Sequence, residues 1–107
     1  MVGIVIVSHS RELADSIVEF TKMMAPEALI RAAGGMDDGT LGTSYEKIYQ
    51  AIEDVYSEDG VLVMMDMGSA VMTTEMVLIL YFVKLKYIAR INDPATKVSR
   101  IIAIGAI

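Results

Sequence analysis

The sequence has no cysteine, only one histidine, and fewer basic than acidic side chains. The absence of cysteine excludes disulfides and thiolate metal sites. The 9 lysines and arginines against 14 acidic residues give a net charge of −5. This balance argues against a nucleic acid partner, because phosphate backbones require clustered basic residues. The longest apolar run, Met76–Val83, is shorter than the about 20 residues that cross a bilayer, and no signal-peptide pattern opens the chain. We therefore expect a cytoplasmic protein without membrane insertion, and we predict no metal and no cofactor.

Short apolar runs alternate with stretches of helical periodicity along the chain. Its length of 107 residues, 54% of them hydrophobic, suits a single domain over residues 1–107 with a substantial core. Strands separated by helices of this length are typical of βαβ units, so we predict an α/β fold with an open parallel sheet. The expected strands are 2–7, 28–33, 61–65 and 88–91, and the expected helices are 10–25, 43–55 and 70–83.

Two of the expected helices carry a start signal and an apolar face. Ser10 is a candidate N-cap of the first helix, and Thr43 stands three residues before Glu46, the spacing of a capping box at the second. Apolar residues at helical spacing are expected to pack on the sheet. They are Leu13, Ile17, Phe20 and Met24 in the first helix and Ile48, Ala51, Ile52 and Val55 in the second.

His9, the sole histidine, directly follows the first apolar strand and is flanked by Ser8 and Ser10. This order places an imidazole on a strand-to-helix turn, and in open α/β sheets ligands gather at the carboxyl ends of the strands. A neutral imidazole can act as a nucleophile or a base near pH 7. His9 is therefore the first candidate for a reactive group, although a structural histidine fits the same pattern.

Three expected strands end in loops that share one edge of the sheet. They present His9, then Gly34–Gly35 with the loop 36–42, and then Asp66 with Gly68–Ser69. A carboxylate can accept one imidazole N–H and leave the other ring nitrogen free to attack. Backbone N–H groups at a helix start attract anions. Together these are parts for moving a phosphoryl group, although each of them alone also fits a turn or a cap.

Two blocks of the sequence resemble a known family. Gly3–Ser10 resembles the opening of the phosphotransfer subunits of PEP-dependent dihydroxyacetone kinases, and Val61–Ala70 is similar to the second signature of that family. Ala33–Gly35 and Gly42–Ser44 fit its middle loop, so the resemblance covers about residues 1–80. The parent group is the mannose-type IIA domains of the sugar phosphotransferase system. The resemblance implies a doubly wound α/β domain, a homodimer, and a phosphate-carrying histidine after the first strand.

The resemblance also implies a phosphoryl relay. The carrier HPr, phosphorylated by enzyme I from phosphoenolpyruvate, would pass its phosphoryl group to His9. His9 would then phosphorylate ADP held on the nucleotide-binding subunit of the kinase. By the same resemblance, Asp66 orients the histidine, and Gly68, Ser69 and Thr43 are the candidate phosphate-binding residues.

The C-terminal end departs from the family pattern from about Lys84 onward. The family shows a Pro-Leu-Val-Glu-Gly-like segment and a final helix, whereas this chain reads Asn92–Arg100 and then Ile101–Ile107. We therefore expect an atypical or truncated end. Within it, Ile101–Ile104 is either a core strand or an interface, because so apolar a patch rarely faces water.

Three other functions share parts of this pattern. A two-component receiver domain also carries an Asp at the end of its third strand, but it needs an acidic pair where this chain has Ser8–Ser10. A flavodoxin-like module needs a first loop richer in Ser, Thr and Gly. The nearest alternative is a IIA subunit that passes phosphate to the IIB protein of a sugar transporter. That type more often carries Trp-Gly-Gly-Ser-Pro where this chain has Asp66–Ala70.

Overall fold

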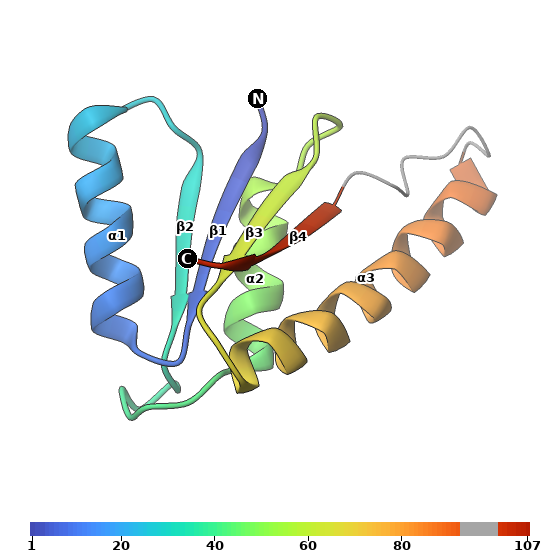
Figure 1. Cartoon of the computed structure of the whole chain (residues 1–107). Coiled ribbons are helices and arrows are strands. Elements are labelled where there is room, and N and C mark those ends of the chain that lie inside the picture. The colour runs from blue at the N-terminus through green and yellow to red at the C-terminus, as the bar shows by residue number, and fades with distance from the viewer. Residues whose placement is uncertain (93–100) are drawn as a thin grey trace.

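The computed structural model describes the backbone of residues 1–92 and 101–107 as one parallel sheet with helices on both faces (Figure 1). The strands are β1 (Gly3–Ser8), β2 (Ile30–Gly34), β3 (Val61–Met65) and β4 (Ile101–Ala106), and the helices are α1 (Arg11–Met24), α2 (Tyr45–Val55) and α3 (Ser69–Asn92). The strand order is β2-β1-β3-β4, and every neighbouring pair is parallel. The predicted α/β fold with an open parallel sheet is confirmed.

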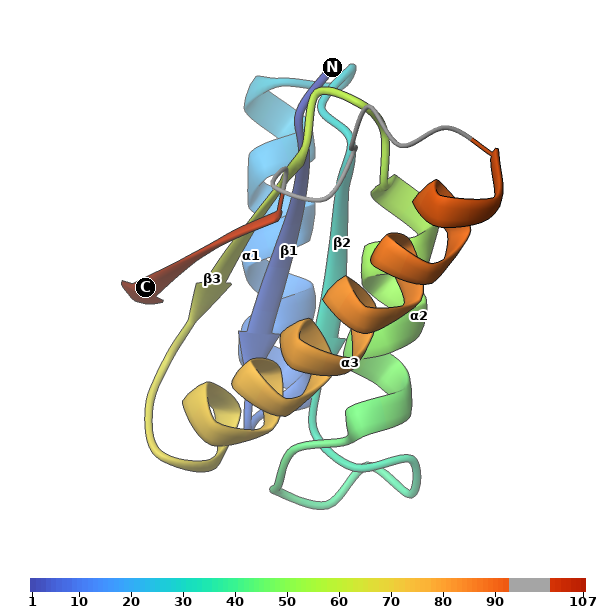
Figure 2. The same ribbon diagram turned by 90° about the vertical axis from the view of Figure 1, so that its right-hand side faces the viewer.

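The sheet is wound on both faces, with α1 on one side and α2 and α3 on the other (Figure 1, Figure 2). Alternate residues of β1 divide between these layers. Val5 and Val7 join the core that includes α2 and α3, whereas Ile6 packs with Ala14 of α1. Full burial of each such aliphatic side chain contributes about 1.5–3 kcal/mol. Strands covered on both faces read as unbroken apolar runs, which is why β1 is so plain a strand in the sequence.

The packed face of α1 differs from the prediction. Of the four residues expected to pack on the sheet, Ile17 is partly buried against it. The other three, Leu13, Phe20 and Met24, are exposed. The helix packs through Ala14 instead, which is fully buried in a cluster with Ile6 and Ile30. A Cβ added to Gly34 would lie 2.7 Å from the Ala14 Cβ and 2.7 Å from the Ser10 carbonyl oxygen. This contact between small residues decides which face of α1 is buried.

The variant Gly34→Ala tests this close approach. The added methyl group would meet the α1 backbone and the Cβ of Ala14, neither of which can rotate away. We expect the free energy of unfolding to fall by about 1–3 kcal/mol, as for other overpacked positions. Urea denaturation followed by circular dichroism measures the change. A loss below about 0.5 kcal/mol, typical of surface substitutions, would contradict the packing described.

Helix α2 begins one residue later than the capping box predicts. Ser44, not Thr43, is the N-cap: it has extended backbone angles, and its hydroxyl accepts a hydrogen bond from the Lys47 backbone N–H at 3.3 Å. Thr43 therefore lies outside the helix, where its side chain can serve another contact. The predicted apolar face is confirmed, since Ile48, Ala51, Ile52 and Val55 are all buried.

Helix α3 continues through Asn92, so the strand expected at Ile88–Ile91 is wrong. No glycine or proline interrupts residues 69–92, and a short apolar run does not distinguish a strand from a helix end. The fourth strand is β4, which contains Ile101–Ile104 and pairs with β3. The structure therefore shows that segment as a strand. Among the helices described, none is both long enough and apolar enough to span a membrane.

Candidate functional site

Three loops meet at the carboxyl edge of the sheet, which is the lower edge in Figure 1. Backbone hydrogen bonds join them. The Asp66 N–H donates to the Val7 carbonyl oxygen at 3.1 Å, and the Gly42 N–H donates to the His9 carbonyl oxygen at 2.8 Å. The loops that follow β1, β2 and β3 therefore form one continuous surface, as their place after parallel strands predicts.

His9 and Asp66 lie in direct contact at the centre of this surface. Nδ1 of His9 is 2.7 Å from Oδ2 of Asp66, which is hydrogen-bonding distance. The His9 side chain is 32% exposed and the Asp66 side chain 13%. An ionised carboxylate only accepts hydrogen bonds, so we assign the ring proton to Nδ1. The imidazole is thus held at one nitrogen, while Nε2 keeps its lone pair.

The Asp66 carboxylate accepts three further hydrogen bonds. Oδ2 accepts from the Ser8 hydroxyl at 2.7 Å and from the His9 backbone N–H at 3.2 Å, and Oδ1 accepts from the Met67 N–H at 2.7 Å. Partial burial raises the pKa of Asp66, but these hydrogen bonds, above all that from Ser8, bring the pKa below its usual 3.8. The carboxylate is therefore ionised at neutral pH and available to the imidazole.

Ser8 is the residue of this site that the sequence did not single out. It ends β1 and is fully buried, and its oxygen also accepts a hydrogen bond from the Ser10 backbone N–H at 2.9 Å. The available signal was its position, because a polar side chain at the buried end of an apolar strand requires hydrogen-bond partners.

A pocket of about 390 Å³ lies beside the His9 ring. The residues that line it are His9, Leu41, Gly42, Met67, Gly68 and Ser69. Ser69 is the first residue of α3, where backbone N–H groups lack partners within the helix and the helix dipole is positive. Gly68 has a φ of +52°, which glycine adopts without strain, and turns the chain into α3. Among the lining residues described there is no lysine or arginine, and the helix start contributes positive potential at the pocket.

Thr43 does not line this pocket itself, but it contacts Ser69, which does. Their hydroxyl oxygens are 2.8 Å apart, so two hydroxyl groups from different loops meet at the start of α3. Hydroxyl groups can donate hydrogen bonds to the oxygens of an anion. All five residues singled out from the sequence thus lie at one edge of the sheet. Within the part of the chain that the structure describes, no group of three or more acidic, histidine or cysteine side chains could hold a metal ion.

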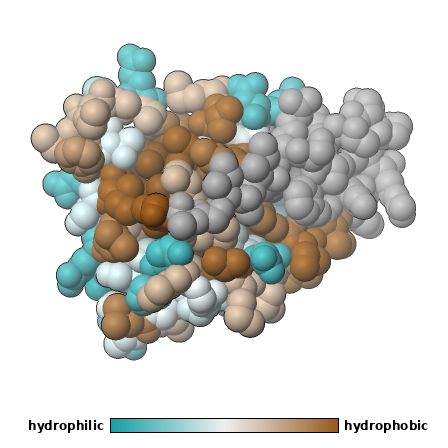
Figure 3. Space-filling model, viewed as in Figure 1, coloured by the Kyte–Doolittle hydropathy of each residue, from teal (hydrophilic) through white to brown (hydrophobic). Residues whose placement is uncertain are grey.

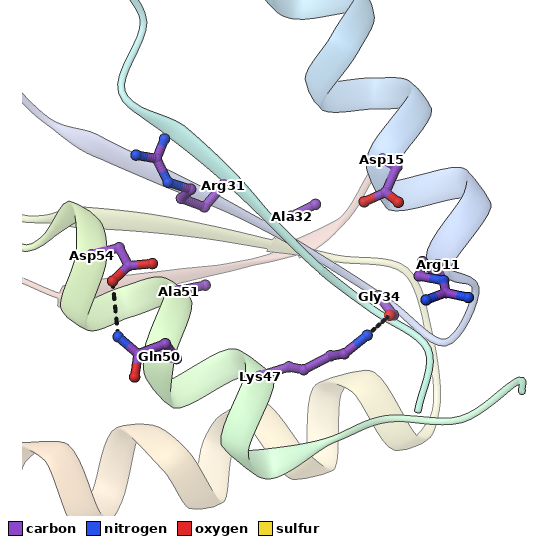
Figure 4. A pocket seen from close by; sticks show the side chains of 9 residues that line it. All are labelled: Arg11, Asp15, Arg31, Ala32, Gly34, Lys47, Gln50, Ala51 and Asp54. Atoms are coloured by element: carbon purple, nitrogen blue, oxygen red, sulfur yellow. Dashed lines mark hydrogen bonds between the residues drawn. The ribbon is translucent and has the colours of Figure 1, made fainter. Parts of the chain in front are cut away.

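A second concavity, of about 220 Å³, lies along the free edge of β2 between α1 and α2 (Figure 4). Two of its three basic side chains cap backbone groups, and the third belongs to Arg11. Lys47 Nζ donates to the Gly34 carbonyl oxygen, and Arg31 Nη1 donates to the Ile30 carbonyl oxygen, both at 3.0 Å. Charged side chains on an edge strand discourage pairing with other chains. This concavity shares no lining residue with the His9 pocket, and we assign it a structural role.

Comparison with known proteins places this fold and site in a family. The family described as PTS system fructose IIA component, EIIA-man, matches residues 3–94. The chain belongs to the EIIA-man family. The resemblance carried by Gly3–Ser10 and Val61–Ala70 is thereby confirmed, and the receiver and flavodoxin alternatives are set aside.

Curated EIIA-man relatives share one subunit name. The chain is 41% identical over 75 residues to the phosphoryl donor subunit DhaM of PEP-dependent dihydroxyacetone kinase 1 from Listeria innocua. It is 44% identical over 79 residues to the DhaM subunit from Escherichia coli strain K12. Each alignment covers 70% of this chain, but 60% of the Listeria protein and 17% of the Escherichia protein. The chain thus spans three fifths or less of the length of these relatives.

A solved structure supports the same fold. The crystal structure of EF1359, a protein of unknown function, is 35% identical to this chain and superposes with a TM-score of 0.66. The match covers 74% of this chain and 61% of that one. This match agrees with the EIIA-man fold that the family model assigns to residues 3–94.

Proposed function

We propose that residues 1–107 form a single phosphotransfer domain. It accepts a phosphoryl group from phospho-HPr on His9 and passes it to ADP on the nucleotide-binding subunit of dihydroxyacetone kinase. The geometry of the His9 ring carries this proposal. Nδ1 is bonded to Asp66, whereas Nε2 has no hydrogen-bond partner among the described residues, and the ring lines the pocket at the start of α3. The names of the relatives support the direction of transfer.

In each proposed transfer, one bond to phosphorus forms as another breaks. The lone pair of His9 Nε2 attacks the phosphorus of phospho-HPr, and the electron pair of the broken bond leaves with HPr. The phosphorylated ring is positively charged, and the Asp66 carboxylate offsets this charge through the Nδ1–H hydrogen bond. A terminal phosphate oxygen of ADP then attacks the same phosphorus. The electron pair of the nitrogen–phosphorus bond returns to the ring, and ATP leaves.

Gly68, Ser69 and Thr43 are the proposed phosphate-binding residues. The hydroxyls of Ser69 and Thr43 are close enough to act on one group, since their oxygens are 2.8 Å apart. The helix start at Ser69 adds backbone donors and a positive dipole. Phosphoryl transfer depends mainly on positioning and on stabilisation of charge, which these groups can supply.

Exposed apolar side chains border the pocket and are the proposed contact surface for both partners. Leu41 and Met67 line the pocket and are 72% and 61% exposed, and Met72 lies on the first turns of α3 and is also exposed. Flexible methionine side chains suit a surface that must meet a donor and an acceptor in turn. Because the chain has a net charge of −5, we expect both partners to bring basic residues to the contact.

A second apolar surface runs along α3 and supports a homodimer. Its side chains fall at positions i, i+4, i+7, i+8 and i+11 of the helix and are each more than half exposed: Met72, Met76, Ile79, Leu80 and Val83. Helix α1 covers only part of its face of the sheet (Figure 1). Hydrophobic surface also lies on the uncovered part of that face (Figure 3). Contiguous apolar patches on a monomer mark interaction sites. We propose that the chain forms a homodimer. We also propose that it acts in the cytoplasm, in the metabolism of dihydroxyacetone and glycerol.

Phosphorylation from phosphoenolpyruvate tests the donor and the acceptor. After incubation with phosphoenolpyruvate, enzyme I and HPr, the chain should gain one phosphoryl group by intact mass, and it should gain none when HPr is omitted. The phosphorylated chain should then lose the group to the kinase subunit with ADP, and ATP should form. Transfer to a sugar-transport IIB protein, with none to ADP, would instead favour the transporter alternative.

A further inference from the structure

We propose that Ser8 is a positioning residue that fixes the ring proton of His9 on Nδ1, acting through Asp66. The importance of this role for phosphoryl transfer rests on the function proposed above. Ser8 ends β1, and its side chain is completely buried between the strand and the first turn of α1. Ser8 is not among the residues that line the His9 pocket, so it acts only through its neighbours.

The direction of each hydrogen bond at Ser8 follows from its partners. The Ser10 backbone N–H can only donate, so it donates to Ser8 Oγ at 2.9 Å. The ionised Asp66 carboxylate can only accept, so the Ser8 hydroxyl donates to Oδ2 at 2.7 Å. His9 Nδ1 lies 2.7 Å from that same oxygen. The single hydroxyl proton of Ser8 is therefore committed to the oxygen on which the His9 ring depends.

Ser8 and Met67 hold the Asp66 carboxylate from opposite ends. The Met67 N–H donates to Oδ1, and the hydroxyl of Ser8, at the end of β1, donates to Oδ2. Because Ser8 is buried, water cannot easily replace its hydroxyl. Without it, the carboxylate can turn about its side-chain bonds and loosen its hydrogen bond to Nδ1. An unrestrained neutral imidazole prefers its proton on Nε2, and that tautomer has no lone pair with which Nε2 can attack phosphorus.

The lowered pKa of Asp66 agrees with this role, since the Ser8 hydrogen bond is the largest of the interactions that lower it. The competing explanation is structural: Ser8 satisfies the Ser10 N–H at the start of α1. Ser10 offers a matched control for that explanation. Its own hydroxyl caps α1 by accepting from the Leu13 N–H at 3.3 Å and has no hydrogen bond to Asp66 in the described structure.

Nitrogen NMR of the unphosphorylated chain tests the proposal directly. His9 is the sole histidine, so at alkaline pH one imidazole reports which nitrogen carries the proton. We expect the Nδ1–H tautomer to dominate in the native chain and in Ser10→Ala. In Ser8→Ala the Nε2–H tautomer should become the major form. Phosphorylation by phospho-HPr should slow roughly 10- to 150-fold in Ser8→Ala, as expected for loss of one hydrogen bond to a charged group.

Two further variants separate the hydroxyl from the size of the side chain. Ser8→Thr keeps the hydroxyl and should retain the Nδ1–H tautomer. Ser8→Cys is close in size but donates weakly, so it should resemble Ser8→Ala, and it serves if the alanine variant does not fold. An unchanged tautomer in Ser8→Cys and Ser8→Ala, or the same change in Ser10→Ala, overturns the proposal. The NMR result does not require phosphoryl transfer, so a native chain that HPr never phosphorylates would refute the proposed function and leave the role of Ser8 standing.

Discussion

We expect His9→Gln to abolish phosphorylation of this chain by phospho-HPr. The imidazole is the only one in the sequence, and its Nε2, which Asp66 leaves available, is the proposed nucleophile. A glutamine amide can still hydrogen-bond to Asp66, but its nitrogen is not nucleophilic. Removal of a nucleophile costs on the order of a thousandfold or more in rate. Label carried from phosphoenolpyruvate measures the loss. In the native chain that label should be labile in acid and stable in alkali, as a phosphoramidate is.

Ser10→Ala is the matched control for this substitution, because Ser10 lies beside the histidine and caps α1 without touching Asp66. It should keep full labelling, even though loss of the cap lowers the free energy of unfolding by about 1 kcal/mol. Label that survives in His9→Gln would contradict the assignment. So would acid-stable label in the native chain, which would indicate a phosphoserine at Ser8 or Ser10.

The shared edge of the site could be predicted because it depends on short-range patterns. The wholly apolar runs that became β1 and β3 each end in a polar residue, and parallel strands bring such ends together. His9 and Asp66 therefore met as expected, at 2.7 Å. The position of Ser69 at the same edge could be predicted for the same reason, because it is the first residue of the helix after β3.

The parts that sequence reasoning missed depend on contacts between distant residues. Helix α1 has apolar side chains on two faces, and periodicity alone cannot choose between them. The close approach of Gly34 to Ala14 makes that choice and leaves Phe20 exposed. Ser8 was overlooked because its partner Asp66 lies 58 residues further along the chain. The strand expected at Ile88–Ile91 is part of α3, because three apolar residues in four fit a strand and a helix end equally well.

The second large effect is expected for Asp66→Asn, which should fold but transfer phosphate roughly 100- to 10,000-fold more slowly at pH 7. The carboxylate accepts on both oxygens, from Met67 at Oδ1 and from Ser8 and His9 at Oδ2. An amide must point its NH₂ group toward one of these sets of donors. If it faces His9, the ring proton moves to Nε2 and blocks attack. If it faces Met67, the ring keeps its tautomer but loses the negative charge that offsets the phosphorylated imidazole.

Asp38→Asn is the matched control for this prediction. Asp38 lies in the loop before Gly42, and the hydrogen bond from the Thr40 hydroxyl holds the pKa of this carboxyl below 3.8, as hydrogen bonds do at Asp66. It has no hydrogen bond to His9 in the described structure, so its variant should transfer phosphate within about twofold of the native rate. Rapid-quench measurements of phospho-HPr consumption compare the two. Equal slowing by both substitutions would mean that the loss reflects a general change in surface charge, because Asp66 would then have no special relation to the imidazole.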